Sequence, residues 1–188
     1  IGKHLVSKGA RKLVLMGITP LPPREKWELA SQAPETRPYI QNKLSELIDL
    51  DRQTDRLEIY TGSISDLDNL NLFFDRIRTD VGTIKGVIHS AGIYSDTKTP
   101  AFVKKDTEAI AKVWEPKVRG IETLHQLCKN DEPDFFISFS SLTGLIPELA
   151  RGVSDYAMAN AFLDFFSSFQ FHQKNKTYYK SITWVDWN

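Results

Sequence analysis

The segment DFFISFSS, residues 134–141, decides the fold class together with the sequence that follows it. It is an apolar run that ends in two small polar residues, which is typical of a buried strand followed by a loop. A helix is predicted next, over residues 155–172, and then a further strand, SITWVDW, over residues 181–187. A strand, a helix and a strand in succession predict a βαβ unit, and therefore a parallel sheet.

The rest of the chain repeats this alternation. Strands are predicted for KLVLMG (12–17), RLEIYTG (56–62) and residues 85–92 within IKGVIHSAG, and helices for residues 2–9, 36–52, 63–82 and 105–129. The helix 36–52 either packs on the sheet or forms a surface insertion. The prolines of TPLPPREKW (19–27) predict a loop without regular structure. The pattern as a whole predicts an α/β protein with a doubly wound parallel sheet, as in Rossmann-like folds.

Length and composition narrow the function classes. The 188 residues suffice for one domain with a hydrophobic core. Basic and acidic residues balance at 24 each, so a nucleic-acid or membrane partner is not expected. Cys128 is the single cysteine, which excludes an internal disulfide and fits a cytoplasmic protein without a signal peptide. The first residues read as a helix already under way, so we expect an excerpt of a longer product.

Small residues occur at the carboxyl ends of four predicted strands. They are Gly17, Gly62, Ser90-Ala91-Gly92 and Ser140-Ser141. A single glycine or serine there is explained by turn formation. Four strand ends that behave alike instead favour a ligand site, because small residues let a flat ligand approach the backbone at that edge of the sheet.

The segment SDYAMANAFLDFF, residues 154–166, places Tyr156 and Asn160 on one face of the predicted helix. A phenol exchanges its proton readily near neutral pH only beside a cation. The helix 105–129 supplies a candidate, since Lys117 lies within its apolar stripe. That stripe consists of Ile110, Trp114, Ile121, Leu124 and Cys128. A lysine on such a face is either paired, functional or extended along the surface to reach solvent.

Three segments carry a resemblance to a known family. EPKVRGIETLHQL (115–127), FSSLTG (139–144) and DYAMANAFLDFF (155–166), in this order, resemble the ketoreductase domain of modular polyketide synthases. That domain belongs to the short-chain dehydrogenase/reductase superfamily. In it, an asparagine follows the tyrosine by four residues and the lysine comes from the preceding long helix. GITPLPPREKW, HSAGIYSD and KTPAFVKK resemble the branch that uses free-standing acyltransferases.

The resemblance implies Lys117, Ser141, Tyr156 and Asn160 as the catalytic set. Tyr156 would give a proton to the carbonyl oxygen, and Lys117 would assist it and hold the nicotinamide ribose. Ser141 would hydrogen-bond the carbonyl, and Asn160 would position the lysine or a relay water. Ser141 is preferred to Ser140 because the family's serine is the second of the pair. An ordinary strand-end hydroxyl and a helix-face amide are the structural alternatives for Ser141 and Asn160.

The resemblance also implies a nicotinamide cofactor, NADPH, and no metal. The cofactor-binding residues would be Gly2, Gly17, Ser63, Ile64, Ser90, Ala91 and Gly92, together with Lys117 and Tyr156. Gly2 resembles the end of the family's Gly-rich loop, so the fold is expected to be truncated within that loop. NADH stays open, because Ile18 stands where the family has an arginine. Arg24 is either a substitute phosphate partner or a solvated surface charge.

The remaining implications concern the substrate. Asp96 corresponds to the last residue of the family's Leu-Asp-Asp motif and would orient the substrate towards the D-configured, B-type hydroxyl. The resemblance implies a ketoreductase domain over residues 1–188, partial at both ends. It would reduce a β-ketoacyl chain on an acyl carrier protein during polyketide biosynthesis, alongside the other domains of a multidomain synthase. The alternatives are a catalytically degenerate structural domain within a synthase and a stand-alone short-chain dehydrogenase.

Overall fold

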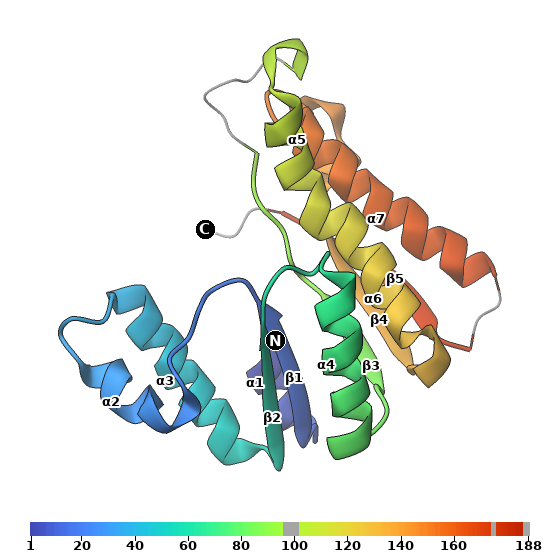
Figure 1. Cartoon of the computed structure of the whole chain (residues 1–188). Coiled ribbons are helices and arrows are strands. Elements are labelled where there is room, and N and C mark those ends of the chain that lie inside the picture. The colour runs from blue at the N-terminus through green and yellow to red at the C-terminus, as the bar shows by residue number, and fades with distance from the viewer. Residues whose placement is uncertain (96–101, 174–175, 186–188) are drawn as a thin grey trace. The chain divides into compact units, whose positions relative to one another are not determined.

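The computed structural model describes residues 1–95, 102–173 and 176–185. The chain divides into two compact units, residues 1–63 and residues 64–188. In both units the strands pair in parallel and alternate with helices (Figure 1). The sequence predicted one parallel sheet, whereas the described strands form two, one in each unit. No helix in the described part of the chain combines the length and apolar character needed to cross a membrane.

The first unit is built on a two-stranded sheet. Its elements are α1 (Gly2–Ser7), β1 (Lys12–Gly17), a 3-10 turn (Arg24–Lys26), α2 (Trp27–Gln32), α3 (Pro38–Gln53) and β2 (Arg56–Thr61). β1 and β2 run in register from Lys12 opposite Arg56 to Gly17 opposite Thr61. The strand predicted for residues 12–17 is therefore confirmed residue by residue.

The helix α3 packs in the core of this unit, which settles the open alternative for residues 36–52. Leu44, Leu47 and Leu50 recur at helical spacing and are buried with Leu13 and Leu57 of the two strands. The Pro-rich segment is shorter than predicted, because the chain is helical from its last residues onwards. The burial of Trp27 explains why this end of the segment is helical. Trp27 lies in the same core and donates its indole N–H to the Pro22 carbonyl at 2.9 Å.

The second unit is built on a three-stranded sheet in the order β3-β4-β5. Its main elements are α4 (Leu67–Asp80), β3 (Gly86–His89), α5 (Thr107–Trp114), a π-helical turn (Glu115–Arg119), α6 (Gly120–Cys128), β4 (Phe135–Ser141), α7 (Ser154–His172) and β5 (Tyr178–Trp184). Short 3-10 turns cover Phe102–Lys104, Lys129–Asp131, Leu142–Gly144 and Pro147–Ala150. β5 begins before the predicted strand, because Tyr179 stacks on Phe136 across the pair at 5.2 Å between ring centroids.

The helices of the second unit place their apolar faces on this sheet. α7 contacts β4 and β5 and lies beside α5 (Figure 1). Ile121, Leu124 and Cys128 of α6 are buried, as the predicted stripe requires. Trp114 is an exception to that stripe, since about a third of it is exposed and its indole N–H donates to the Asp155 carbonyl at 2.9 Å.

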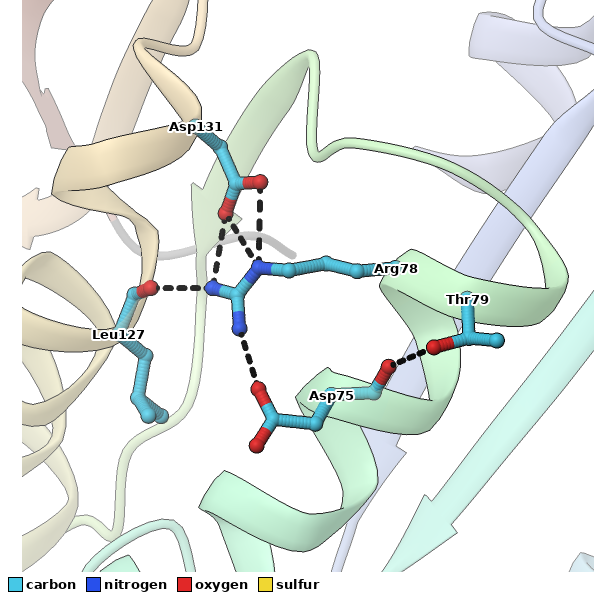
Figure 2. A network of polar contacts seen from close by, with 5 residues as sticks. All are labelled: Asp75, Arg78, Thr79, Leu127 and Asp131. Carbon is cyan, nitrogen blue, oxygen red and sulfur yellow. Dashed lines mark hydrogen bonds and ion pairs between the residues drawn. The ribbon is translucent and has the colours of Figure 1, made fainter.

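An arginine joins α4 to the end of α6. The Arg78 guanidinium makes three contacts of 2.9–3.2 Å with the Asp131 carboxylate. It also contacts Asp75 at 3.0 Å and the Leu127 carbonyl at 2.5 Å (Figure 2). The Asp131 side chain is 3% exposed and that of Arg78 is 29% exposed. A carboxylate buried to this degree depends on its partner.

We expect Arg78→Met to lower the free energy of unfolding by roughly 2–4 kcal/mol, because Asp131 would keep a buried charge without a partner. Urea unfolding of the full-length protein, followed by hydrogen exchange at the α4 and α6 amides, measures the change. Arg151→Met is the control, since Arg151 is exposed and its removal leaves no buried charge. A loss no larger than that of the control would contradict the assignment.

Candidate active site

A pocket of about 330 Å³ opens at the carboxyl ends of the strands in the second unit. Four segments contribute to it: the residues after β3, the π-helical turn, the end of β4 with the start of α7, and the end of β5. The lining residues are Ser90, Gly92, Ile93, Tyr94, Lys117, Phe139, Ser140, Ser141, Tyr156, Trp184 and Val185. The predicted site residues Lys117, Ser141 and Tyr156 therefore meet in one pocket, although they come from three different elements.

Lys117 owes its position to the π-helical turn. Pro116 has no backbone N–H, so the regular helical hydrogen bonding cannot continue through it, and the chain forms a π turn between α5 and α6. Lys117 is 4% exposed, and its ammonium donates to the Phe139 carbonyl at 2.9 Å. The lysine thus points into the pocket and does not extend to solvent. Burial lowers the pKa of Lys117 to about 8, and the charge of Asp164 acts in the opposite direction.

Tyr156 lies in the first turn of α7, and its ring contacts two pocket residues. The Lys117 ammonium nitrogen is 5.6 Å from the centroid of that ring. The Tyr94 ring lies against it with 4.9 Å between centroids and an interplanar angle of 54°. A cation and an aromatic wall therefore flank the phenol.

The two serines at the end of β4 differ in what their hydroxyl groups do. The Ser140 hydroxyl is buried, and it shares its single proton between the Asn160 carbonyl at 3.1 Å and the Asp164 carboxylate at 3.0 Å. The Ser141 hydroxyl accepts a hydrogen bond from the Thr143 backbone N–H at 3.3 Å. Among the described residues, the Ser141 hydroxyl donates its own proton to no acceptor. Ser141 is thus the better placed of the pair to donate into the pocket.

Asn160 lies behind the pocket and does not line it. Its side-chain N–H donates to the Tyr156 carbonyl at 2.8 Å, one turn earlier in α7. The residue is fully buried, and its side-chain oxygen has no hydrogen-bond partner among the described residues. A buried amide oxygen without a partner is costly, which is consistent with a water or ligand contact there.

The predicted cofactor residues fall into several groups. Ser90 and Gly92 line the pocket, whereas Ala91 and Ile64 of the same unit do not. Gly2, Gly17 and Ser63 belong to the first unit. Asp96, the predicted substrate-orienting residue, lies outside the described residues.

Arg24 was predicted to contact a phosphate or to be a solvated surface charge, and the structure places it at the surface of the first unit with its side chain 45% exposed. Its guanidinium forms an ion pair with Asp51 at 2.7 Å and hydrogen-bonds the Leu57 carbonyl. It also lies over the Trp27 ring, 5.2 Å from the ring centroid. Arg24 therefore ties the start of α2 to α3 and β2. Ile18, which follows β1, is exposed.

The sequence did not indicate two features of the site. Asp164 accepts hydrogen bonds from Ser140 and from Ser181 at 3.0 and 2.5 Å, so a carboxylate lies beneath the lysine end of the pocket. Asp155, next to Tyr156, forms a buried ion pair with Lys105. Both contacts join residues that are distant in the chain. The single available signal was an acidic residue directly before the tyrosine, and that is common at any helix start.

Parallel strand pairs with a pocket at their carboxyl ends, and a buried lysine beside a tyrosine in that pocket, define a short-chain dehydrogenase/reductase fold. A short-chain dehydrogenase/reductase of Brucella melitensis shares this fold, with a TM-score of 0.68 at 14% identity over 97% of this chain and 68% of that chain. The sequence model of the KR domain family matches residues 1–188. The chain therefore belongs to the KR domain family, the ketoreductase domains of polyketide synthases.

Individual relatives agree with this assignment. The chain is 36% identical over 186 residues to polyketide synthase PksL of Bacillus subtilis (strain 168), covering 98% of this chain and 4% of that protein. It is 32% identical over 186 residues to 5-methyl-1-naphthoate synthase of Streptomyces sahachiroi, covering 98% of this chain and 10% of that protein. The chain thus spans a small part of the length of these curated relatives.

Two solved ketoreductases are similar over the whole chain. An N-terminal ketoreductase from the macrolactin assembly line superposes with a TM-score of 0.79 at 27% identity, covering 100% of this chain and 34% of that one. A ketoreductase domain from the bacillaene assembly line gives a TM-score of 0.77 at 27% identity, covering 99% and 40%. The doubly wound α/β class predicted from the sequence is confirmed.

Proposed function

We propose that this chain reduces the β-keto group of an acyl thioester carried on an acyl carrier protein, with NADPH as the hydride donor. The observation that carries the proposal is the pocket in which Lys117, Ser141 and Tyr156 converge. Membership of the KR domain family supports the reaction class. The length of the relatives, of which the chain matches only a small part, supports neighbouring synthase domains. The carrier-bound substrate is proposed from the resemblance to the ketoreductase family.

The pocket residues suit the reduction of a ketone. Negative charge develops on the carbonyl oxygen as the ketone is reduced, so a proton donor and a hydrogen bond must be in place there. In our proposal the Tyr156 hydroxyl donates the proton and the Ser141 hydroxyl donates the hydrogen bond. The Lys117 ammonium, close to the tyrosine ring, stabilises the phenolate that remains. Asn160 holds the first turn of α7 through the Tyr156 carbonyl.

The pocket also fits one end of a nicotinamide cofactor. The Lys117 ammonium has three N–H donors. Among the described residues, one of them bonds to an acceptor, the Phe139 carbonyl. The other donors suit ribose hydroxyls, and the small Ser90 and Gly92 let a flat ring approach the backbone. When bound, the cofactor supplies the hydride. Gly2, Gly17, Ser63 and Ile64 are proposed to hold the remainder of the cofactor.

The preference for NADPH rests on resemblance alone, since Ile18 replaces the expected arginine and Arg24 is engaged elsewhere. Calorimetric titration of the full-length protein with NADPH and with NADH tests both the cofactor and its identity. Cofactor oxidation in the presence of a β-ketoacyl thioester surrogate tests the reaction. A protein that binds neither nucleotide would instead be the structural, non-catalytic domain that the sequence left as an alternative.

The lowered pKa of Lys117 predicts a pH dependence. We expect kcat/KM for the cofactor to fall as the pH rises through about 8, because the lysine loses its proton there. Asp164→Asn should move this fall to lower pH, since the charge of Asp164 favours the ammonium form. Burial and the charge of Lys117 lower the pKa of His89 to about 4, so His89 stays neutral over this range.

A pH–rate profile of the wild type, of Asp164→Asn and of Glu148→Gln measures this effect. Glu148 is exposed and serves as the control for removal of one carboxylate from the same unit. An identical alkaline limb in all three proteins would show that Asp164 does not act on the lysine.

A further inference from the structure

A buried cluster of charged and polar side chains lies beside the pocket. The Lys105 ammonium is 2.8 Å from one oxygen of the Asp155 carboxylate, and the two side chains are 2% and 1% exposed. The Ser95 hydroxyl donates to the same oxygen at 2.7 Å and accepts a hydrogen bond from Lys105. Lys105 and Asp155 come from distant parts of the chain, and the cluster joins them through Ser95.

The stability of the fold does not by itself explain why charged side chains occupy this buried position. Burial by itself would raise the pKa of Asp155, but the hydrogen bonds from Lys105 and Ser95 outweigh it, and the pKa lies below its ordinary value. The carboxylate is therefore charged and paired near neutral pH. Apolar residues of similar volume often stabilise a fold as well as a buried ion pair does, because both charges must be desolvated. What the ion pair adds is a fixed geometry, and Asp155 stands directly before Tyr156.

The start of α7 depends on this geometry. The helix begins after Val153, whose side chain gives no capping hydrogen bond. Asp155 is held instead, at its side chain by Lys105 and Ser95 and at its carbonyl by the Trp114 indole N–H at 2.9 Å. The first turn of α7 is thus anchored from two sides at the residue that precedes the proposed proton donor.

The other end of the cluster also leads to the pocket. Ser95 directly follows Tyr94, whose ring lies 4.9 Å from that of Tyr156 between centroids. Both tyrosines line the pocket, while Ser95 and Asp155 are buried behind them. One cluster therefore anchors the proton donor and the aromatic wall beside it.

We propose that Lys105, Ser95 and Asp155 form a positioning cluster that sets Tyr94 and Tyr156 relative to each other and thereby controls the rate and the configuration of the reduction. The inference rests on the proposed function. A wall next to the proton donor restricts how the two substituents of the ketone lie when the carbonyl reaches the Tyr156 hydroxyl. The cluster touches no reacting atom, so its three members are positioning residues.

The experiment compares Lys105→Met/Asp155→Leu with the wild type in the full-length protein. The double variant removes both charges of the Lys105–Asp155 pair together, so neither member of that pair is left facing an apolar substitute. With a β-ketoacyl thioester surrogate, we expect kcat to fall by roughly 10- to 100-fold, as for a small misplacement of a catalytic group. The KM for the cofactor should stay within about twofold, because Lys117 and the cofactor side of the pocket are unchanged. Chiral chromatography should show a less pure hydroxyl configuration.

Two further variants sharpen the test. Lys176→Met removes a lysine from an exposed ion pair of the same 2.8 Å length, with Glu132, and should change neither kcat nor configuration. Ser95→Ala keeps the ion pair, so it remains informative if the double variant does not fold, and it should shift the configuration in the same direction. A folded double variant or Ser95→Ala protein with wild-type kcat and configuration would overturn the inference.

Hydrogen exchange separates this inference from the proposed function. Amides of residues 157–160, which bond back to the first turn of α7, should exchange faster in the double variant than in the wild type, whether or not the protein reduces ketones. A wild type without reductase activity would overturn the proposed function only. Unchanged exchange at the start of α7 would overturn the positioning cluster.

Discussion

Tyr156→Phe is expected to lower kcat by about 10³-fold, the range of a lost general acid, while the dissociation constant for the cofactor changes by less than about threefold. The change removes one hydroxyl group and keeps the ring. The phenyl ring can still lie against Tyr94 and beside the Lys117 ammonium, so the pocket wall and the cation stay in place. Single-turnover kinetics with the thioester surrogate, combined with cofactor titration, separate the chemical step from binding.

Tyr94→Phe provides the matched control for this variant. It removes a hydroxyl from the neighbouring ring of the same pair, and Tyr94 lines the same pocket. If Tyr156 is the proton donor, the Tyr94 variant keeps most of the activity and the Tyr156 variant does not. Retention of more than a tenth of the wild-type kcat by Tyr156→Phe would assign the proton to another group.

Short-range patterns in the sequence predicted the strands and most helices. The strand at residues 12–17 and the helix at residues 155–172 are close to β1 and α7, because apolar spacing along ten or twenty residues encodes which face is buried. The same periodicity placed Lys117 on the apolar face of its helix, and the structure decides for burial over extension to solvent. Its π-helical turn did not, although Pro116 indicated that the helix could not continue regularly.

Contacts between distant residues explain what the sequence did not predict. Arg24 is held by Asp51 and Leu57, and the last residues of the Pro-rich segment become helical because Trp27 is buried against a core built from later elements. Trp114 fits an apolar stripe by spacing but lies at its edge, where it bonds to α7. The packing of neighbouring elements decides such positions, and a single sequence does not display it.

In the candidate site, too, some features were expected from the sequence and others depend on contacts between distant residues. The resemblance to the ketoreductase family implied that Lys117, Ser141 and Tyr156 act together, and the structure brings them into one pocket. Only Ser141 was expected there from its place at the end of a parallel strand. The charged residues around the pocket were not expected. Asp164 bonds to Ser140 and Lys105 pairs with Asp155, and the spacing of residues along the chain does not reveal either partner. Asn160 was expected within the catalytic set, and the structure places it behind the pocket wall.

Lys117→Met is expected to lower kcat by about 10²-fold or more and, unlike Tyr156→Phe, to weaken cofactor binding as well. Methionine retains much of the buried volume of the lysine stem but has no charge and no N–H donor. The proposed role of Lys117 combines stabilisation of the phenolate with hydrogen bonds to the ribose, so both rate and affinity should change. Lys112→Met, an exposed lysine in α5, is the control and should change neither.

The same variant should not lower the stability of the fold near neutral pH. Because burial lowers the pKa of Lys117 to about 8, from an ordinary value of 10.5, folding is opposed by the proton that the lysine carries below pH 8. Between about pH 8 and 10.5 the lysine is protonated in the unfolded chain but largely neutral in the folded protein, so the wild type gains stability as the pH rises through this window.

Lys117→Met has no proton to lose at this position, so its stability should not rise in this window. Urea unfolding at pH 7 and pH 10 should therefore show a pH-dependent difference between the two proteins, with the variant at least as stable at pH 7. A variant that is clearly less stable than the wild type at pH 7 would mean that Lys117 is retained for the fold, and the loss of activity would then no longer point to chemistry.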